Sequence, residues 1–138
     1  MQKIKEFISD NSDEIFVTGG VSEETLGELE RSLSIYLCES MRKFLSECGM
    51  LLGFGIEILG CGKNGKSPLV NETIKYRELG LNKNYIVIRN VDEWVYCLDN
   101  NTGVIYSWDR IDKTYLKCAD SLEDYILIEL NEAKADWE

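Results

Sequence analysis

Residues 85–118, with the sequence YIVIRNVDEWVYCLDNNTGVIYSWDRIDKTYLKC, set the fold class of this chain. Four runs rich in aromatic and β-branched residues alternate there with polar turns, a composition typical of β-strands. We expect these strands at residues 85–89, 94–98, 104–108 and 115–118. The connections between them are only four to six residues long. Because a parallel crossover needs about a dozen residues or more, such short connections predict antiparallel neighbours.

Helical patterns lie on both sides of this meander. Before it, apolar residues at helical spacing predict helices over 2–10 and 38–48, and Ser22 is expected to cap another helix between them. After it, Ser121 begins a terminal helix with a capping-box pattern. Between these parts we expect a strand at 54–58 and a short helix at 69–79. The predicted fold is α+β, a mostly antiparallel, twisted sheet with helices from the N-terminal part and the C-terminus packed around it.

The length of 138 residues is that of one domain, so we expect a single domain over residues 1–138. No apolar run approaches the ~18 residues that a membrane-spanning helix needs, and the polar start does not resemble a signal peptide. The five cysteines are odd in number and form no C-x-x-C pair, which favours reduced, buried thiols. We therefore expect a cytoplasmic protein that does not associate with membranes.

The chain carries a formal net charge of −10 and contains no histidine. The lack of histidine removes the commonest general base and the commonest zinc ligand. The negative charge argues against nucleic-acid binding, because carboxylates and phosphates repel one another. We therefore expect no catalytic residues, no metal and no cofactor. The charge itself is explained either by solubility or by a basic protein partner.

One segment nevertheless fits the template of a phosphate-binding loop. It reads Gly60-Cys61-Gly62-Lys63-Asn64-Gly65-Lys66-Ser67, which satisfies G-x-x-x-x-G-K-[ST]. A small nucleotide-binding protein is therefore an alternative, with Lys66 on phosphate and Ser67 on magnesium. Against this, Pro68 lacks the N–H that a phosphate-cradling helix should offer, and such loops belong to parallel sheets rather than hairpins. We expect a flexible glycine-rich loop over the sheet.

Aromatic and acidic residues concentrate at the ends of the central strands. The aromatic residues are expected to pair across strands, either as sheet core or as anchors of an interface. The carboxylates beside them form either a solvated rim or the charged border of that interface. The candidate partner-binding residues are Asp92, Glu93, Trp94, Tyr106, Trp108 and Asp109.

Several short motifs carry a resemblance to a known family. The segment GVSEETL at 20–26, with Leu29-Glu30 after it, looks like a helix opening of the form G-x-S/T-E-E-x-I…L-E. The other matching segments are Cys48-Gly49 at a helix end, Ile58-Leu59-Gly60 at a strand end, Trp94-Val95-Tyr96-Cys97-Leu98-Asp99, and Ser121-Leu122-Glu123-Asp124-Tyr125-Ile126. In this order, over residues 14–130, they resemble the SUKH superfamily, the bacterial immunity proteins related to the yeast cell-wall-synthesis regulator family.

The resemblance implies an α+β fold and a non-enzymatic function. Such a protein binds and neutralises a cognate bacterial polymorphic toxin by occlusion, and the toxin is expected to be a basic nuclease domain. A regulatory adaptor with a cellular partner is a further alternative, and either protein would be a monomer or a weak homodimer. The family's toxin-facing residues vary, so the resemblance assigns no site residue. Leu37-Cys38 replaces the usual Leu-Pro and Cys48-Gly49-Met50 replaces Asn-Gly-Gly, which leaves the subgroup open.

Overall fold

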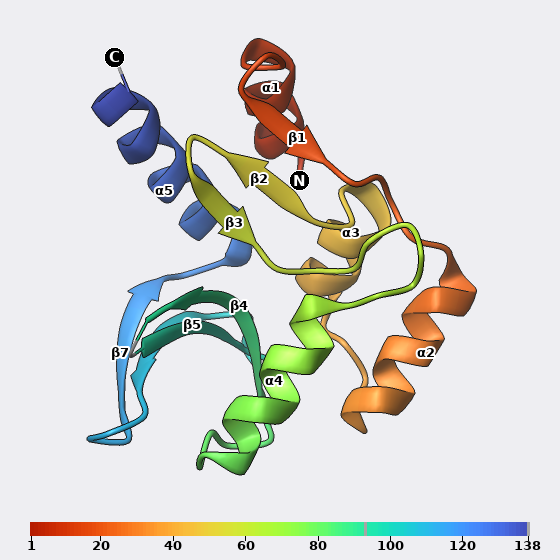
Figure 1. The fold of residues 1–138 in the computed structure, drawn as a ribbon, viewed down its shortest axis with the longest axis vertical. Helices are drawn as coiled ribbons and strands as arrows, with labels where there is room; N and C mark the ends of the chain where they lie inside the picture. The colour runs from red at the N-terminus through yellow and green to blue at the C-terminus, as the bar shows by residue number, and fades with distance from the viewer. Residues whose placement is uncertain (93, 138) are drawn as a thin grey trace.

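A computed structural model describes residues 1–92 and 94–137 of the chain. These residues form five helices and seven strands (Figure 1). In chain order they are α1 (Gln2–Asp10), β1 (Ile15–Val17), α2 (Glu23–Leu33), α3 (Glu39–Glu47), β2 (Leu51–Gly53), β3 (Ile56–Ile58), α4 (Pro68–Glu78), β4 (Tyr85–Val91), β5 (Trp94–Asp99), β6 (Ile105–Asp109), β7 (Thr114–Ala119) and α5 (Leu122–Trp137). Helices combined with antiparallel sheet confirm the predicted α+β class.

The strands form two antiparallel sheets, where the sequence predicted one. The first sheet has the order β1-β2-β3 and the second the order β4-β5-β6-β7. The four strands predicted from residues 85–118 are all present and pair as successive hairpins, so the antiparallel meander is confirmed. The two sheets are linked where the N–H of Leu59, just after β3, donates to the carbonyl of Ile88 on β4 at 2.8 Å.

Helices cover both faces of the four-stranded sheet. On one face, Tyr76 of α4 packs edge-on against Trp108 of β6, with ring centroids 6.2 Å apart. On the other face, Tyr125 of α5 packs against Tyr96 of β5, with ring centroids 5.1 Å apart. Because successive strand residues point to opposite faces, the position of an aromatic residue along its strand decides which helix it meets.

Two serines begin helices where the sequence predicted them. The Ser22 hydroxyl accepts a hydrogen bond from the N–H of Thr25 at 3.2 Å, at the start of α2. The Ser121 hydroxyl accepts one from the N–H of Asp124 at 3.1 Å, at the start of α5. Each bond satisfies an N–H that the first helical turn leaves without an intrahelical partner, which stabilises a helix by about 1 kcal/mol.

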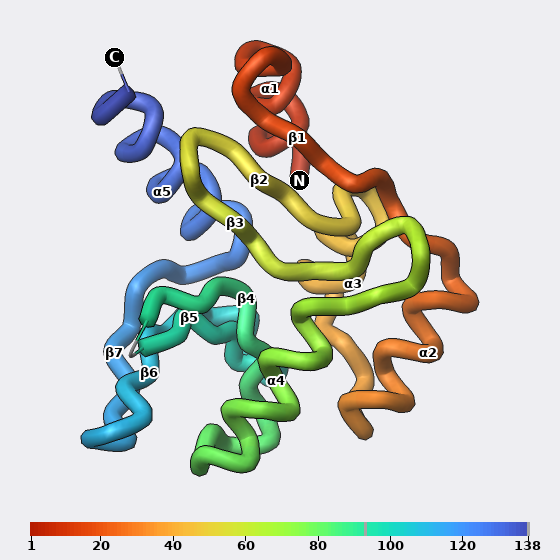
Figure 2. The backbone as a smooth tube through the Cα atoms, viewed as in Figure 1, coloured from red at the N-terminus to blue at the C-terminus, as the bar shows by residue number. Residues whose placement is uncertain are grey.

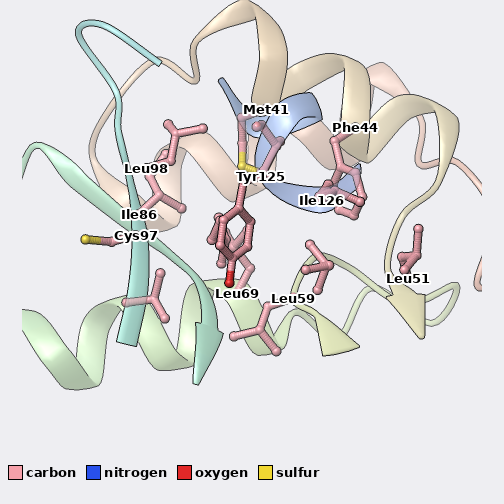
Figure 3. Close-up of a cluster of buried hydrophobic side chains, with 14 of the residues drawn as sticks. Met41, Phe44, Leu51, Leu59, Leu69, Ile86, Cys97, Leu98, Tyr125 and Ile126 are labelled. Carbon is pink, nitrogen blue, oxygen red and sulfur yellow. The ribbon is translucent and has the colours of Figure 1, made fainter. Parts of the chain in front are cut away.

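One hydrophobic core joins the helices to both sheets (Figure 3). Met41 and Phe44 of α3 and Ile126 of α5 are fully buried, as are Ile86 and Leu98 on the four-stranded sheet. Full burial of an aliphatic or aromatic side chain of this size contributes roughly 1.5–3 kcal/mol each. Among the described residues, no helix has the length and hydropathy to cross a membrane.

The smaller sheet contains a hairpin that the sequence analysis did not predict. The strand expected at 54–58 is shorter, because Phe54 and Gly55 form the two-residue turn between β2 and β3. Both turn residues have positive φ angles, +50° and +80°. Such turns match the right-handed twist of the strands that they join. Residues 15–17 form β1 at the edge of this sheet, a strand that the sequence analysis did not predict.

Candidate functional site

The glycine-rich loop 60–67 runs from the end of β3 to the start of α4 (Figure 2). The backbone N–H groups of Cys61, Gly62, Gly65 and Lys66 donate hydrogen bonds within the protein. The N–H of Cys61 donates to the carbonyl of Gly49 at 3.1 Å, and that of Gly62 to the carbonyl of Lys66 at 2.9 Å. A phosphate cradle needs several such N–H groups free and directed at one point. This loop uses them to hold its own shape instead.

Ser67 is buried, and its hydroxyl group has two partners in the fold. It donates to the carbonyl of Gly60 at 2.9 Å and accepts from the N–H of Val70 at 3.2 Å. Ser67 therefore closes the loop and caps α4, which explains both its identity and the proline that follows it. Lys66 beside it is exposed and forms no ion pair with any acid in the part of the chain that the structure describes.

The loop geometry gives a direct prediction for nucleotides. ATP or GTP with magnesium is expected to leave the thermal unfolding midpoint unchanged, because four of the loop N–H groups and the Ser67 hydroxyl already have partners in the fold. Lys66→Ala is expected to change the free energy of unfolding by no more than about 0.5 kcal/mol, as for an exposed residue. Thermal unfolding with and without nucleotide measures both. A stabilisation by nucleotide that disappears in Lys66→Ala would support the nucleotide-binding alternative.

The structure places the predicted partner-binding residues on two different faces. Trp94 pairs directly with Asp109 across β5 and β6, and it is 41 % exposed. Asp92 is exposed in the turn that precedes β5, with a φ of 52°. Glu93 lies outside the described residues. Asp92, Trp94 and Asp109 therefore lie together at one end of the four-stranded sheet.

Trp108 and Tyr106 lie on the opposite face of the sheet, because they alternate with Asp109 along β6. Trp108 is only 1 % exposed, and the rings of Tyr76 and Tyr115 pack against it. The ammonium group of Lys113 lies 5.4 Å from its ring centroid. Trp108 is thus a core residue that cannot act as an exposed anchor, and the predicted residues do not form one surface.

The cysteines have packing roles at three positions. Cys48, Cys61 and Cys97 are buried, whereas Cys118 is exposed, and all of the cysteines are free thiols. Burial raises the pKa of Cys48 to about 11 and also raises the pKa of Cys97. These thiols therefore stay protonated near neutral pH, which makes them poor nucleophiles and metal ligands. The described residues include no cluster of three or more histidine, cysteine or acidic side chains that is placed to hold a metal ion.

Two arginines join elements of the fold through ion pairs with glutamates. Arg42 of α3 contacts Glu30 at 2.9 Å and Glu23 at 2.8 Å, which ties α3 to α2. Arg89 of β4 contacts Glu129 of α5 at 3.1 Å, which ties the four-stranded sheet to the terminal helix. Each arginine links two elements of the fold. We therefore assign these groups structural roles rather than a place in a binding site.

The smaller sheet carries a surface that the sequence analysis did not single out. Phe16, Leu52 and Glu57 pair in one row across β1, β2 and β3, and all three are exposed. We call this row the outer sheet face. The residues that adjoin this row along the strands point to the opposite face of the smaller sheet. On that face, the side chain of Leu130 on α5 approaches Gly53. The sequence signal that could have revealed it is Gly55 between two apolar runs, because glycine is favoured at the second residue of a two-residue hairpin turn.

These features define an acidic α+β protein built from two antiparallel sheets, and its family follows from comparison. A family model described as SMI1-KNR4 cell-wall, SUKH_5, matches residues 1–131. The chain belongs to this family, and the resemblance to the SUKH superfamily is confirmed. A solved protein structure from Pseudomonas syringae pv. tomato is similar, with a TM-score of 0.64 and 20% sequence identity, over 77% of this chain and 79% of that one. At this identity, the likeness supports the fold alone.

Proposed function

We propose that this chain is an immunity protein, a non-enzymatic cytoplasmic domain that binds a cognate bacterial toxin domain and neutralises it by occlusion. Membership of the family over residues 1–131 supports this function, because the SUKH superfamily includes many immunity proteins. The proposal assigns the chain a binding function rather than catalysis. The groups that would serve catalysis best are the Ser67 hydroxyl and the buried cysteine thiols. The hydroxyl is hydrogen-bonded within the fold, and the thiols are buried.

The observation that carries the proposal is the excess of negative charge. The chain has 25 acidic and 15 basic residues, and the ion pairs among the described residues engage only a minority of the acids. An acidic surface attracts a basic partner and speeds encounter. It also masks the positive face with which a nuclease binds phosphates. On the acidic surface of the chain, Asp92, Trp94 and Asp109 are one proposed contact with the toxin.

The experiment tests neutralisation directly. The tagged chain is used to capture partners from its native host, and each captured protein is then expressed alone and together with the chain. We expect a basic partner that stops growth when expressed alone and allows growth when expressed with the chain. Purified chain should also inhibit the activity of that partner at stoichiometric concentration. A captured partner that is harmless alone would instead favour the regulatory-adaptor alternative.

A further inference from the structure

The outer sheet face is unusually apolar for a surface that no helix or strand of the described residues covers. Phe16 is 65 % exposed and Leu52 is 47 % exposed, and the two lie directly opposite each other on neighbouring strands. Strands with one solvated face normally carry polar residues on that face. Two large apolar side chains held side by side in water are typical of an interaction surface rather than of scattered exposed residues.

The outer sheet face continues into a shallow groove with an aromatic wall. The groove has a volume of about 450 Å³, and Phe16, Leu52, Phe54 and Trp137 line it together with the loop before β1. Trp137 of α5 packs edge-on against Phe54, with ring centroids 5.8 Å apart, and remains largely exposed. The fold therefore holds the wall of the groove in place. A rigid aromatic group beside a concave apolar surface is a common anchor of protein interfaces.

Carboxylates border this groove and the outer sheet face. Asp13 and Glu14 line the groove, and Glu57 completes the row on the sheet. In the part of the chain that the structure describes, which includes every lysine and arginine, these three acids form no ion pair. Lys134, a basic residue on the last helix, lies over the ring of Phe7, 5.9 Å from its centroid. No ion pair among the described residues therefore neutralises the three border acids.

We infer that the outer sheet face and its groove bind a basic protein domain, which inserts an apolar side chain between Phe16, Leu52 and Trp137 while its lysines and arginines pair with the acidic border. This inference rests on the proposed function and names the surface through which the toxin is bound. Charge complementarity selects the partner, because a second copy of this chain would bring two identical acidic borders together. A basic domain gains both the apolar contact and the ion pairs.

The test compares two groups of surface variants with a matched control. Phe16→Thr/Leu52→Thr removes the apolar pair but keeps residues that favour strands. Glu14→Gln/Glu57→Gln removes two charges from the border. The control is Leu116→Thr, an aliphatic residue 68 % exposed on strand β7 of the other sheet. The partner captured by the wild-type chain is purified, and its dissociation constant and association rate with each variant are measured at two salt concentrations, with circular dichroism to confirm folding.

We expect Phe16→Thr/Leu52→Thr to weaken binding at least about tenfold, as for the loss of an interface anchor. Glu14→Gln/Glu57→Gln should slow association and reduce its salt dependence. Leu116→Thr should change the dissociation constant by less than about twofold, since exposed residues outside an interface contribute little. Trp94→Ala, in the other proposed contact, should have a smaller effect than the loss of the apolar pair.

The outcomes separate this inference from the proposed function. If Phe16→Thr/Leu52→Thr neutralises a captured toxin as well as the wild type does, the surface is wrong and the function stands. If a captured basic protein is harmless but loses its binding to the double variant, the surface stands and the function is wrong. A wild-type dimer in solution that dissociates in the double variant would replace the basic partner with a second copy and overturn the inference. Capture of no basic protein would overturn both.

Discussion

Trp108→Ala is expected to lower the free energy of unfolding by about 3–5 kcal/mol, the cost of truncating a buried aromatic residue. Trp108 lies on β6, an inner strand of the four-stranded sheet, where Val95 on β5 and Tyr115 on β7 are its direct cross-strand neighbours. The ring of Tyr76 covers it from α4. Alanine would leave a cavity between the sheet and this helix, which the rigid strands cannot close. Urea unfolding followed by circular dichroism measures the difference.

The matched control for this prediction is Trp94→Ala. Trp94 is the same type of residue in the neighbouring strand, but it points to the other face and is partly exposed. We expect its replacement to lower the free energy of unfolding by no more than about 1 kcal/mol. Similar losses for the two variants would contradict the assignment of Trp108 to the core and Trp94 to the surface.

This contrast shows how far the sequence defines the large sheet. The aromatic and β-branched runs predicted four strands and their hairpin order, because strand composition and loop length are local properties. They did not predict which aromatic residues are covered. That depends on where α4 and α5 pack, and these contacts join Tyr76 to Trp108 and Tyr125 to Tyr96 across long separations in the chain.

The smaller sheet was harder to predict for a different reason. The two strands that were not predicted, β1 and β2, are only three residues long, too short for a period of two to be seen. The partner of β1 is β2, which follows two helices later, so that pairing has no local signal. The candidate surface formed by Phe16 and Leu52 exists only once that pairing is made. The sequence-based site therefore concentrated on residues 92–109, where the strands were visible.

The glycine-rich loop shows that a sequence motif can have a purely structural cause. Gly65 has a φ of +77°, a conformation that residues with a side chain rarely adopt. Gly60 lies against the backbone of Gly49, and Ser67 caps the helix that follows. Three separate structural requirements thus place glycine and serine at positions that match the phosphate-loop template. The match is explained without any nucleotide.

Gly60→Ala is expected to destabilise the protein by about 3 kcal/mol or more, because overpacking against rigid backbone is among the costly single changes. A Cβ atom at residue 60 would overlap the carbonyl oxygen of Gly49. That carbonyl also accepts the N–H of Cys61, so it cannot move away without breaking a hydrogen bond that joins the loop to the end of α3. Thermal and urea unfolding should both show the loss.

Gly62→Ala is the matched control in the same loop. Its added Cβ would lie 3.4 Å from the Asn64 side chain, which is ordinary van der Waals contact. We expect a change in the free energy of unfolding of no more than about 1 kcal/mol for this variant. If Gly60→Ala were as stable as the wild type but weakened binding of a nucleotide, the glycine would be explained by a ligand rather than by packing. A large loss of stability at Gly60 alone instead places the close contact between the loop and Gly49 among the interactions that hold the two-sheet fold together.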